Sequence, residues 1–179
     1  DLNRRVRTSS DPLTTALRLA IAGNVIDFGV NGGLTESEAR ESVVGALTQP
    51  FHGDPGAFRN TVRRARRILY LADNAGEIVF DRLLIQQLPA DRVTVVVRGQ
   101  PILNDATIVD ARAAGLCDLV EVIDNGSDAP GTILETCSGE FRQRFSESDL
   151  IIAKGQGNFE TLSEADARIY FLLKVKCAV

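Results

Sequence analysis

The chain has 179 residues, of which 44% are hydrophobic and 25% are charged. This is an average globular composition, and it excludes a disordered, collagen-like or coiled-coil chain. Lys and Arg number 20 against 24 Asp and Glu, whereas proteins that bind DNA or RNA usually carry the opposite balance. No apolar run approaches the roughly 20 residues that cross a bilayer. We therefore expect neither nucleic acid nor a membrane among the partners.

The cysteine and histidine content argues against several kinds of site. The three cysteines, Cys117, Cys137 and Cys177, lie far apart without CxxC spacing. This pattern favours reduced thiols in a cytoplasmic protein over a disulfide framework or a zinc site. His52 is the only histidine in the sequence, so a Ser-His-Asp or Cys-His site would have to be built around it. Because methionine is absent and the chain ends in an apolar run, we expect a fragment of a longer protein.

Residues 1–63 have the pattern of a helical region. An Asp-Pro pair followed by helix-spaced apolar residues predicts a first helix over 11–27. A capping-box spacing predicts a second helix over roughly 36–47. After a loop, a third helix carries 58–66.

From residue 67 onwards, strands and helices alternate. Short apolar runs predict buried strands, with helix-spaced segments between them. The predicted strands are 68–72, 93–97, 119–123, 150–153 and 170–175, and the predicted helices are 76–88, 105–114, 132–145 and 158–167. Such alternation is typical of an α/β fold with a mainly parallel, Rossmann-like sheet in three layers. The predicted α/β domain covers 64–179.

Polar and glycine residues collect where four consecutive predicted strands end. These segments are 73–77, 99–105, 124–128 and 154–158. In parallel sheets, ligands bind beyond the carboxyl ends of the strands, near helix N-termini. Core packing gives no reason to gather carboxylates, amides and a lysine on one edge. The pattern therefore favours one functional site at that edge.

The residue types at this edge suit a metal ion and a phosphate group. Asp73, Asn74 and Asp105 offer only oxygen atoms, which a hard cation such as Mg²⁺ or Mn²⁺ selects. Lys154 in a glycine-rich turn suits a phosphate oxygen, and Gly155 would let backbone N–H groups approach it. A divalent ion beside a lysine implies a phosphorylated substrate.

Each of these motifs has a purely structural alternative. An Asp-Asn pair after a strand, or the pair Asn104-Asp105, is often a helix cap. Lys154 by itself could be a solvated surface residue. Glu77 could simply favour the helix dipole in a first turn. Only the joint occurrence of these motifs on one edge favours a site.

A further polar pair lies in the helical region. Asn24 and Asp27 are one turn apart near the end of the first predicted helix. They either cap that helix or overhang the pocket, where they would touch the substrate or the water shell of a metal ion.

Five segments together resemble the DUF89 family of damage-control phosphatases, in its small microbial stand-alone branch. They are AGNVIDFG (22–29), LADNAGEIVFD (71–81), PILNDAT (101–107), DNGSDAPGT (124–132) and AKGQGNFET (153–161). Members are metal-dependent enzymes that remove phosphate from harmful or surplus phosphometabolites. The resemblance covers roughly residues 11–177. The paired cysteines that this branch carries near its N-terminus do not occur in this chain.

The resemblance implies a helical region packed on an α/β domain that binds metal and phosphate. It implies Asp73, Asn74 and Asp105 as ligands of Mg²⁺, Mn²⁺, Co²⁺ or Ni²⁺, and Lys154 with Gly155 as the phosphate contact. We predict Asp73, Asp105 and Lys154 as the catalytic residues. The predicted substrate contacts are Asn24, Asp27, Glu77, Asn104, Gly155 and Asn158.

The predicted function is that of a metal-dependent phosphoric monoester hydrolase acting on a small phosphorylated metabolite. One alternative is a methyltransferase that uses S-adenosylmethionine. Such an enzyme requires a glycine-rich loop after its first strand and an acidic residue at the end of its second strand. In this chain the first loop is acidic, and the second strand ends with Arg98-Gly99. Another alternative is a non-enzymatic, metal-dependent binder of phosphorylated ligands, which only turnover distinguishes from an enzyme. The sequence leaves the oligomeric state open.

Overall fold

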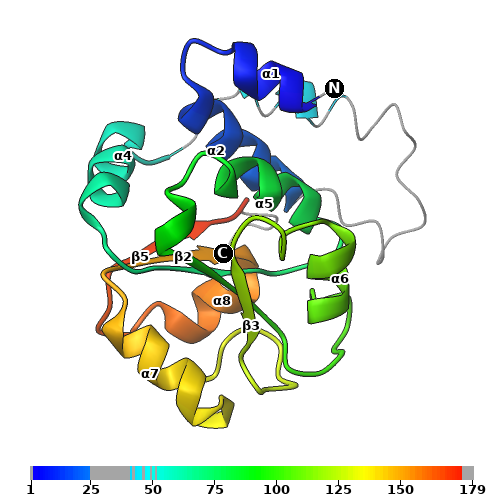
Figure 1. Ribbon diagram of the computed structural model, residues 1–179, viewed down its shortest axis with the longest axis vertical. Helices are drawn as coiled ribbons and strands as arrows, with labels where there is room; N and C mark the ends of the chain where they lie inside the picture. The colour runs from blue at the N-terminus through cyan, green and yellow to red at the C-terminus, as the bar shows by residue number, and fades with distance from the viewer. Residues whose placement is uncertain are drawn as a thin grey trace.

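A parallel sheet forms the centre of the molecule (Figure 1). The computed structural model describes residues 2–24, 41, 43–45, 47–48, 50 and 52–174. The five strands are β1 (Ile68–Leu71), β2 (Val93–Val97), β3 (Glu121–Asp124), β4 (Leu150–Lys154) and β5 (Ile169–Leu172). They lie in the order β3-β2-β1-β4-β5, and every neighbouring pair is parallel. The order reverses between β1 and β4, and in such sheets the crevice beyond that point binds ligands.

Helices cover both faces of the sheet. They are α1 (Leu2–Thr8), α2 (Pro12–Gly23), α4 (Pro55–Arg64), α5 (Ile78–Ile85), α6 (Ile108–Ala113), α7 (Gly139–Glu147) and α8 (Gly155–Leu162), with 3₁₀ turns η1 (Ala90–Arg92) and η2 (Leu134–Thr136). Figure 1 shows α1, α2, α4 and α5 on one side of the sheet and α7 and α8 on the other. This arrangement gives three layers, so the predicted α/β fold class is confirmed.

Alternating residues of β1 point into two separate apolar cores. Tyr70 packs in the core beneath α2, α4 and α5, whereas Leu69 and Leu71 pack with Phe141 and Phe145 of α7. All residues of β1 and β4 are buried, as expected for central strands of a parallel sheet. Both strand ends that flank the crevice are therefore held rigidly by packing.

Two helices of the N-terminal region begin at Asp-Pro pairs. Asp11 Oδ1 accepts a hydrogen bond from Thr14 N at 3.1 Å at the start of α2. Asp54 Oδ1 accepts from Ala57 N at 3.1 Å at the start of α4. In each case, the proline sits at the first helical position, where its missing N–H is not needed. Apolar faces of both helices share one core with the sheet.

The main departures from the predicted elements lie after β3 and β4. The predicted helix over 132–145 is replaced by η2 and α7, because the segment before α7 is hydrogen-bonded to the loop after β3. Ser138 N donates to Asn125 O at 2.9 Å, and the Ser138 side chain caps α7. The helix predicted over 158–167 begins earlier, at Gly155, directly after β4. The third strand begins at Glu121, two residues later than predicted.

Some predictions fall on residues that the structure does not describe. Asp27, Cys177 and most of the helix predicted over 36–47 lie outside the described residues. The division at residue 63/64 stays a prediction, although helices from before it and strands from after it share one core. None of the described helices is long and apolar enough to cross a bilayer.

Candidate functional site

The turns after β1 and β2 pair with each other beyond the edge of the sheet. Ala75 N donates to Asn104 O at 2.8 Å, and Ala106 N donates to Asp73 O at 2.7 Å. Asn74 and Asp105 thereby form an isolated antiparallel bridge. The structure thus brings together Asp73, Asn74 and Asp105, the three residues predicted as metal ligands.

In each of these three side chains, one polar atom makes hydrogen bonds, and the oxygen Oδ1 makes none with a described residue. Asp73 Oδ2 accepts hydrogen bonds from Asn74 Nδ2 at 3.2 Å and Asn24 Nδ2 at 3.3 Å. Asn74 Nδ2 also donates to Glu77 Oε1 at 2.6 Å. Asp105 Oδ2 accepts from Arg98 Nε at 2.5 Å. The Oδ1 atoms of Asp73, Asn74 and Asp105 make no side-chain hydrogen bond with any described residue.

Gly155 allows the Asp73 carboxylate to occupy this position. It has a φ of +78°, and a Cβ there would overlap the Asp73 carboxylate. Burial raises the pKa of Asp73 from 3.8 to about 7, and the nearby carboxylates of Glu77 and Asp105 add to this rise. The Asp73 carboxylate therefore lies in a crowded negative environment that a cation would relieve.

Lys154 lies beneath the site and is completely buried. Its Nζ donates to Glu77 Oε2 at 2.9 Å and to Asp81 Oδ1 at 2.6 Å. Burial alone would lower the pKa of Lys154, but Asp81 and Glu77 outweigh this effect and raise it above its usual value. From the sequence, Lys154 was expected to be a mobile charge that contacts a phosphate oxygen. The structure instead places the ammonium group against two carboxylates, because Asp81 of α5 and Glu77, the N-cap residue of that helix, both face the end of β4.

A second buried layer continues from Asp81. Tyr70 Oη donates to Asp81 Oδ1 at 2.8 Å, while Asp81 Oδ2 is buried and makes no hydrogen bond with the described residues. Burial has the largest effect on Asp81 and raises its pKa, although the positive charge of Lys154 opposes this rise. Burial also raises the pKa of Tyr70, and the charge of Asp81 adds to it. Tyr70 therefore stays a neutral donor.

The charges of this connected set do not balance. Four carboxylates, those of Asp73, Glu77, Asp81 and Asp105, face two cations, Lys154 and Arg98. With all carboxylates ionised, the set carries two negative charges in excess. Uncompensated buried charge is strongly unfavourable, so the arrangement suits one divalent cation. Among the described residues, no group of three or more His, Cys, Asp or Glu side chains could hold a metal ion. The candidate ligands are two carboxylates and one amide.

Arg98 is a site residue that the sequence analysis did not predict. It follows β2 directly and is 4% exposed. Its Nη1 donates to Thr132 Oγ1 at 3.2 Å, and its Nη2 lies 3.5 Å from Asn158 Oδ1. Asp81 was missed as well. Its spacing of four from Glu77 places both carboxylates on one face of α5, and this signal could have found it.

Two of the predicted substrate contacts, Asn24 and Asn158, make hydrogen bonds that join neighbouring parts of the chain. Asn24 donates to Glu77 Oε1 at 3.0 Å, and its Oδ1 accepts from Lys174 N at 3.3 Å. Asn158 is buried and donates to Lys154 O at 2.7 Å and Ala72 O at 3.3 Å, which joins the ends of β4 and β1. Asn104 is half-buried beside Asp105.

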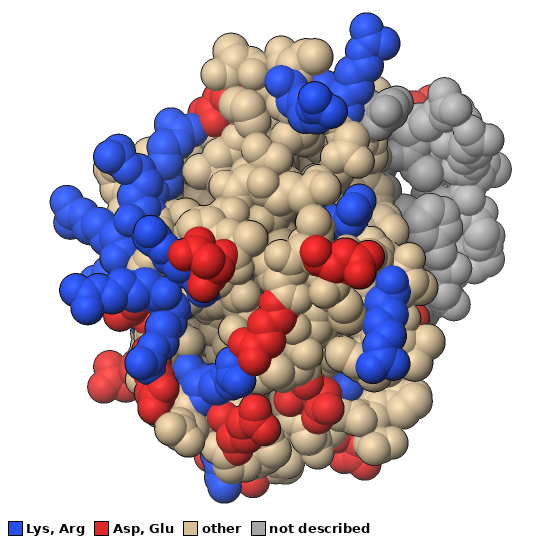
Figure 2. Space-filling view, in the orientation of Figure 1, with Lys and Arg blue, Asp and Glu red and all other residues tan. Residues whose placement is uncertain are grey.

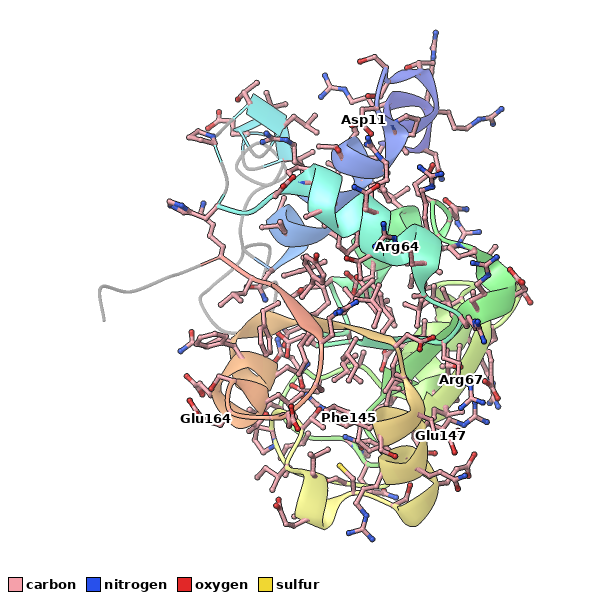
Figure 3. The ribbon with its side chains drawn as sticks, turned by 90° about the vertical axis from the view of Figure 1, so that its left-hand side faces the viewer. Asp11, Arg64, Arg67, Phe145, Glu147 and Glu164 are labelled. Carbon is pink, nitrogen blue, oxygen red and sulfur yellow. The ribbon has the colours of Figure 1, made fainter. Side chains whose placement is uncertain are left out.

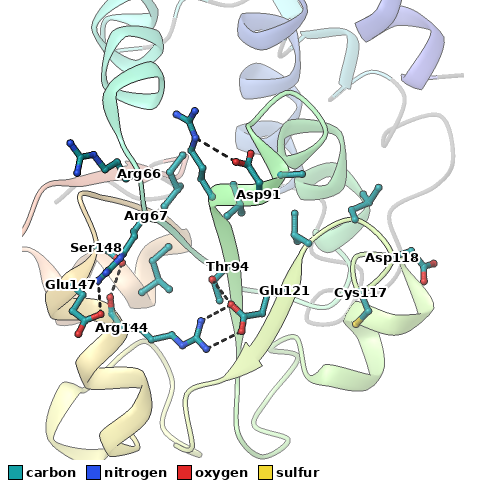
Figure 4. A pocket seen from close by; sticks show the side chains of 17 residues that line it. Arg66, Arg67, Asp91, Thr94, Cys117, Asp118, Glu121, Arg144, Glu147 and Ser148 are labelled. Carbon is teal, nitrogen blue, oxygen red and sulfur yellow. Dashed lines mark hydrogen bonds and ion pairs between the residues drawn. The ribbon is translucent and has the colours of Figure 1, made fainter.

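A cavity of about 830 Å³ lies at the opposite, amino-terminal edge of the sheet (Figure 4). Two arginines that line it are already paired with carboxylates. Arg144 donates to Glu121 at 2.5 and 2.9 Å, and Arg67 donates to Glu147 at 2.5 Å. Figure 3 shows Arg67 and Glu147 side by side on the surface. Figure 2 shows basic side chains gathered on the side that carries α4, next to this cavity. These exposed pairs resemble ordinary surface ion pairs, so we do not place the chemistry here.

Comparisons with known proteins point to one family. Residues 1–179 match the family model described as a damage-control phosphatase ARMT1-like domain. A Pyrococcus horikoshii protein named damage-control phosphatase is 46% identical over 90% of this chain and 58% of its own length. A damage-control phosphatase of Archaeoglobus fulgidus is 39% identical over 96% of this chain and 61% of its own. An uncharacterized Methanocaldococcus jannaschii protein is 43% identical over 88% of this chain and 54% of its own length.

A solved structure supports the same assignment. The crystal structure of a DUF89 family protein from Pyrococcus horikoshii has a TM-score of 0.85 and 41% sequence identity, covering 99% of this chain and 65% of that one. The chain therefore spans less than two thirds of the length of these relatives.

Proposed function

Because the chain belongs to the damage-control phosphatase ARMT1-like domain family, we propose that it carries the active site of a metal-dependent phosphatase. The reaction is hydrolysis of a phosphate monoester on a small phosphorylated metabolite. Two named damage-control phosphatases at 46% and 39% identity support the reaction class.

The observation that carries this proposal is a group of three side-chain oxygens among four carboxylates and only two cations. Asp73, Asn74 and Asp105 each present an Oδ1 that no described residue hydrogen-bonds. An all-oxygen donor set of this kind suits a hard divalent cation. We therefore assign these residues as ligands of Mg²⁺, Mn²⁺, Co²⁺ or Ni²⁺.

A bound divalent cation would supply Lewis-acid stabilisation to a phosphate oxygen. The chain's own residues orient the proposed ligands. Asn24 and Asn74 hold Asp73 Oδ2, and Arg98 holds Asp105 Oδ2. Since side chains that fix ligand orientation tune metal affinity, these contacts contribute to the activity without touching the substrate.

Lys154 has a positioning role in this proposal. Its ammonium group donates hydrogen bonds to the buried carboxylates of Glu77 and Asp81, and Glu77 in turn orients Asn74. The first backbone N–H groups of α8, which begins at Gly155, remain as donors for phosphate oxygens. Asn104 and Asp27 stay predicted substrate contacts.

The test is turnover by the purified protein with p-nitrophenyl phosphate and a panel of sugar phosphates. Each of Mg²⁺, Mn²⁺, Co²⁺ and Ni²⁺ is added in turn, with and without a chelator. We expect phosphate release that depends on the metal and stops with the chelator. Metal binding without release from any substrate would favour the alternative of a non-enzymatic binder. Calorimetric titration with S-adenosylmethionine tests the methyltransferase alternative, which the acidic turn after β1 and the family assignment both disfavour.

A further inference from the structure

We infer that Arg98 determines which divalent cation the site prefers, because it keeps one oxygen of Asp105 from the cation. The inference rests on the proposed metal site. It concerns a residue that acts through Asp105 and does not itself bind the metal. The quantity that tests this role is the ratio of the affinities of the site for two metal ions.

The contact between Arg98 and Asp105 is short and buried. Nε of Arg98 donates to Asp105 Oδ2 at 2.5 Å, and the two side chains are only 3% and 7% exposed. A hydrogen bond between two charged groups is among the strongest in proteins, and breaking a buried one is strongly unfavourable. A cation of moderate affinity would therefore leave Oδ2 on the guanidinium and bind Oδ1.

The guanidinium group is also held at its far end. Nη1 donates to Thr132 Oγ1 at 3.2 Å, and Nη2 lies 3.5 Å from Asn158 Oδ1. Thr132 Oγ1 donates to the same Asn158 oxygen at 2.7 Å. The backbone is fixed as well, because Arg98 N donates to Ala106 O at 2.9 Å. Arg98 cannot turn away from Asp105 without breaking several of these contacts.

The other carboxylate is restricted in the same way. Asp73 Oδ2 receives the amides of Asn24 and Asn74 and packs against Gly155, whose missing Cβ provides the space. Each carboxylate therefore presents a single oxygen. Ca²⁺ takes six to eight oxygens and often binds both oxygens of a carboxylate, whereas Mg²⁺ keeps an octahedral shell with few protein ligands and several waters. A site with two single-oxygen carboxylates disfavours Ca²⁺.

The experiment measures dissociation constants for Mn²⁺ and Ca²⁺ in the wild type and in two variants. Arg98→Gln removes the guanidinium, and Arg98→Lys keeps the charge but not the planar fork. We expect the ratio of the Ca²⁺ to the Mn²⁺ constant to fall about tenfold or more in both variants, in line with other residues that orient metal ligands. A simple change of charge would shift both constants alike and leave the ratio unchanged.

Arg142→Gln is the matched control, because it removes an exposed guanidinium on α7 and leaves the bond between Arg98 Nε and Asp105 in place. We expect its ratio to stay close to that of the wild type. An unchanged ratio in both Arg98 variants, in a protein that binds Mn²⁺, would overturn the inference and leave the proposed function standing. Failure of the wild type to bind any of the cations would overturn the proposed metal site itself.

A crystal of the wild type with Mn²⁺ tests the inference even where the variants do not fold. We expect Asp105 to bind the ion through Oδ1 alone, with Oδ2 still on Arg98. Two Asp105 oxygens on the ion would overturn the inference.

Discussion

Gly155 and Asp73 are packed so closely that a side chain on the glycine would overlap the carboxylate. The glycine also has a φ of +78°, which other residues adopt only with strain. The turn that starts α8 is therefore matched to the turn that follows β1. This fit holds one of the proposed metal ligands in place.

Replacing Gly155 with alanine should damage the site more than the fold. Gly155→Ala is expected to displace Asp73, to weaken Mn²⁺ binding and to reduce stability by about 1–3 kcal/mol. Calorimetric titration and urea unfolding measure the two effects. Gly139→Ala is the control, since a Cβ at Gly139 meets nothing within 4 Å and the residue lies in a helix. It should leave binding unchanged, and equal losses in both variants would contradict the explanation.

Removing a carboxylate from the site should abolish metal binding. Asp73→Ala and Asp105→Ala are each expected to eliminate both Mn²⁺ binding and phosphatase activity, because each removes a ligand and half of the excess negative charge. Asp128→Ala is the control, since Asp128 is exposed in the loop after β3. Full Mn²⁺ affinity in either site variant would show that the ion binds elsewhere.

Lys154→Met should unfold more easily, because it leaves Glu77 and Asp81 without their buried cation. Loss of one partner from a buried ion pair typically costs about 3–5 kcal/mol. Denaturant titration of the metal-free protein measures this loss. Lys174→Met changes an exposed lysine and should be nearly neutral. If Lys154→Met were as stable as the wild type and lost only phosphate affinity, Lys154 would be the phosphate contact that the sequence analysis expected.

The metal-free protein should become less stable as the pH rises from about 4 to 7. Over this interval the Asp73 carboxyl, whose pKa rises from 3.8 to about 7 on folding, keeps its proton in the folded state and loses it in the unfolded state. The free energy of unfolding then falls by up to about 1.4 kcal/mol per pH unit, and the contribution is gone above pH 7. Urea unfolding in the presence of a chelator measures this slope. In Asp73→Asn the slope should flatten, and an unchanged slope would assign the effect to another group.

The sequence predicted the sheet and the edge at which three polar residues meet, because both follow from local patterns. Apolar runs set the strands, and parallel strands bring the residues after β1 and β2 to one edge. Asp73, Asn74 and Asp105 were found together for this reason. The role of these three residues as metal ligands is part of the proposed function.

What the sequence did not reveal is which polar residues are buried and paired. Arg98 follows β2 like an ordinary end-of-strand arginine, and only its contacts with Asp105 and Thr132 show its place in the site. Lys154 was interpreted as a mobile charge, because its partners on α5 lie more than 70 residues away in the chain. Such pairings depend on tertiary packing, which has no local signature.

Asn24 joins the end of α2 to the site and also to Lys174, two residues after the end of β5. Its Oδ1 accepts from Lys174 N, so its amide group is aimed at Asp73 and Glu77. We therefore expect binding of the proposed cation to be coupled to the packing of these two chain segments, and such coupling acts equally in both directions. A substitution that loosens α2 from its core should weaken cation affinity, and saturating cation should protect the backbone amides of α2 from hydrogen exchange.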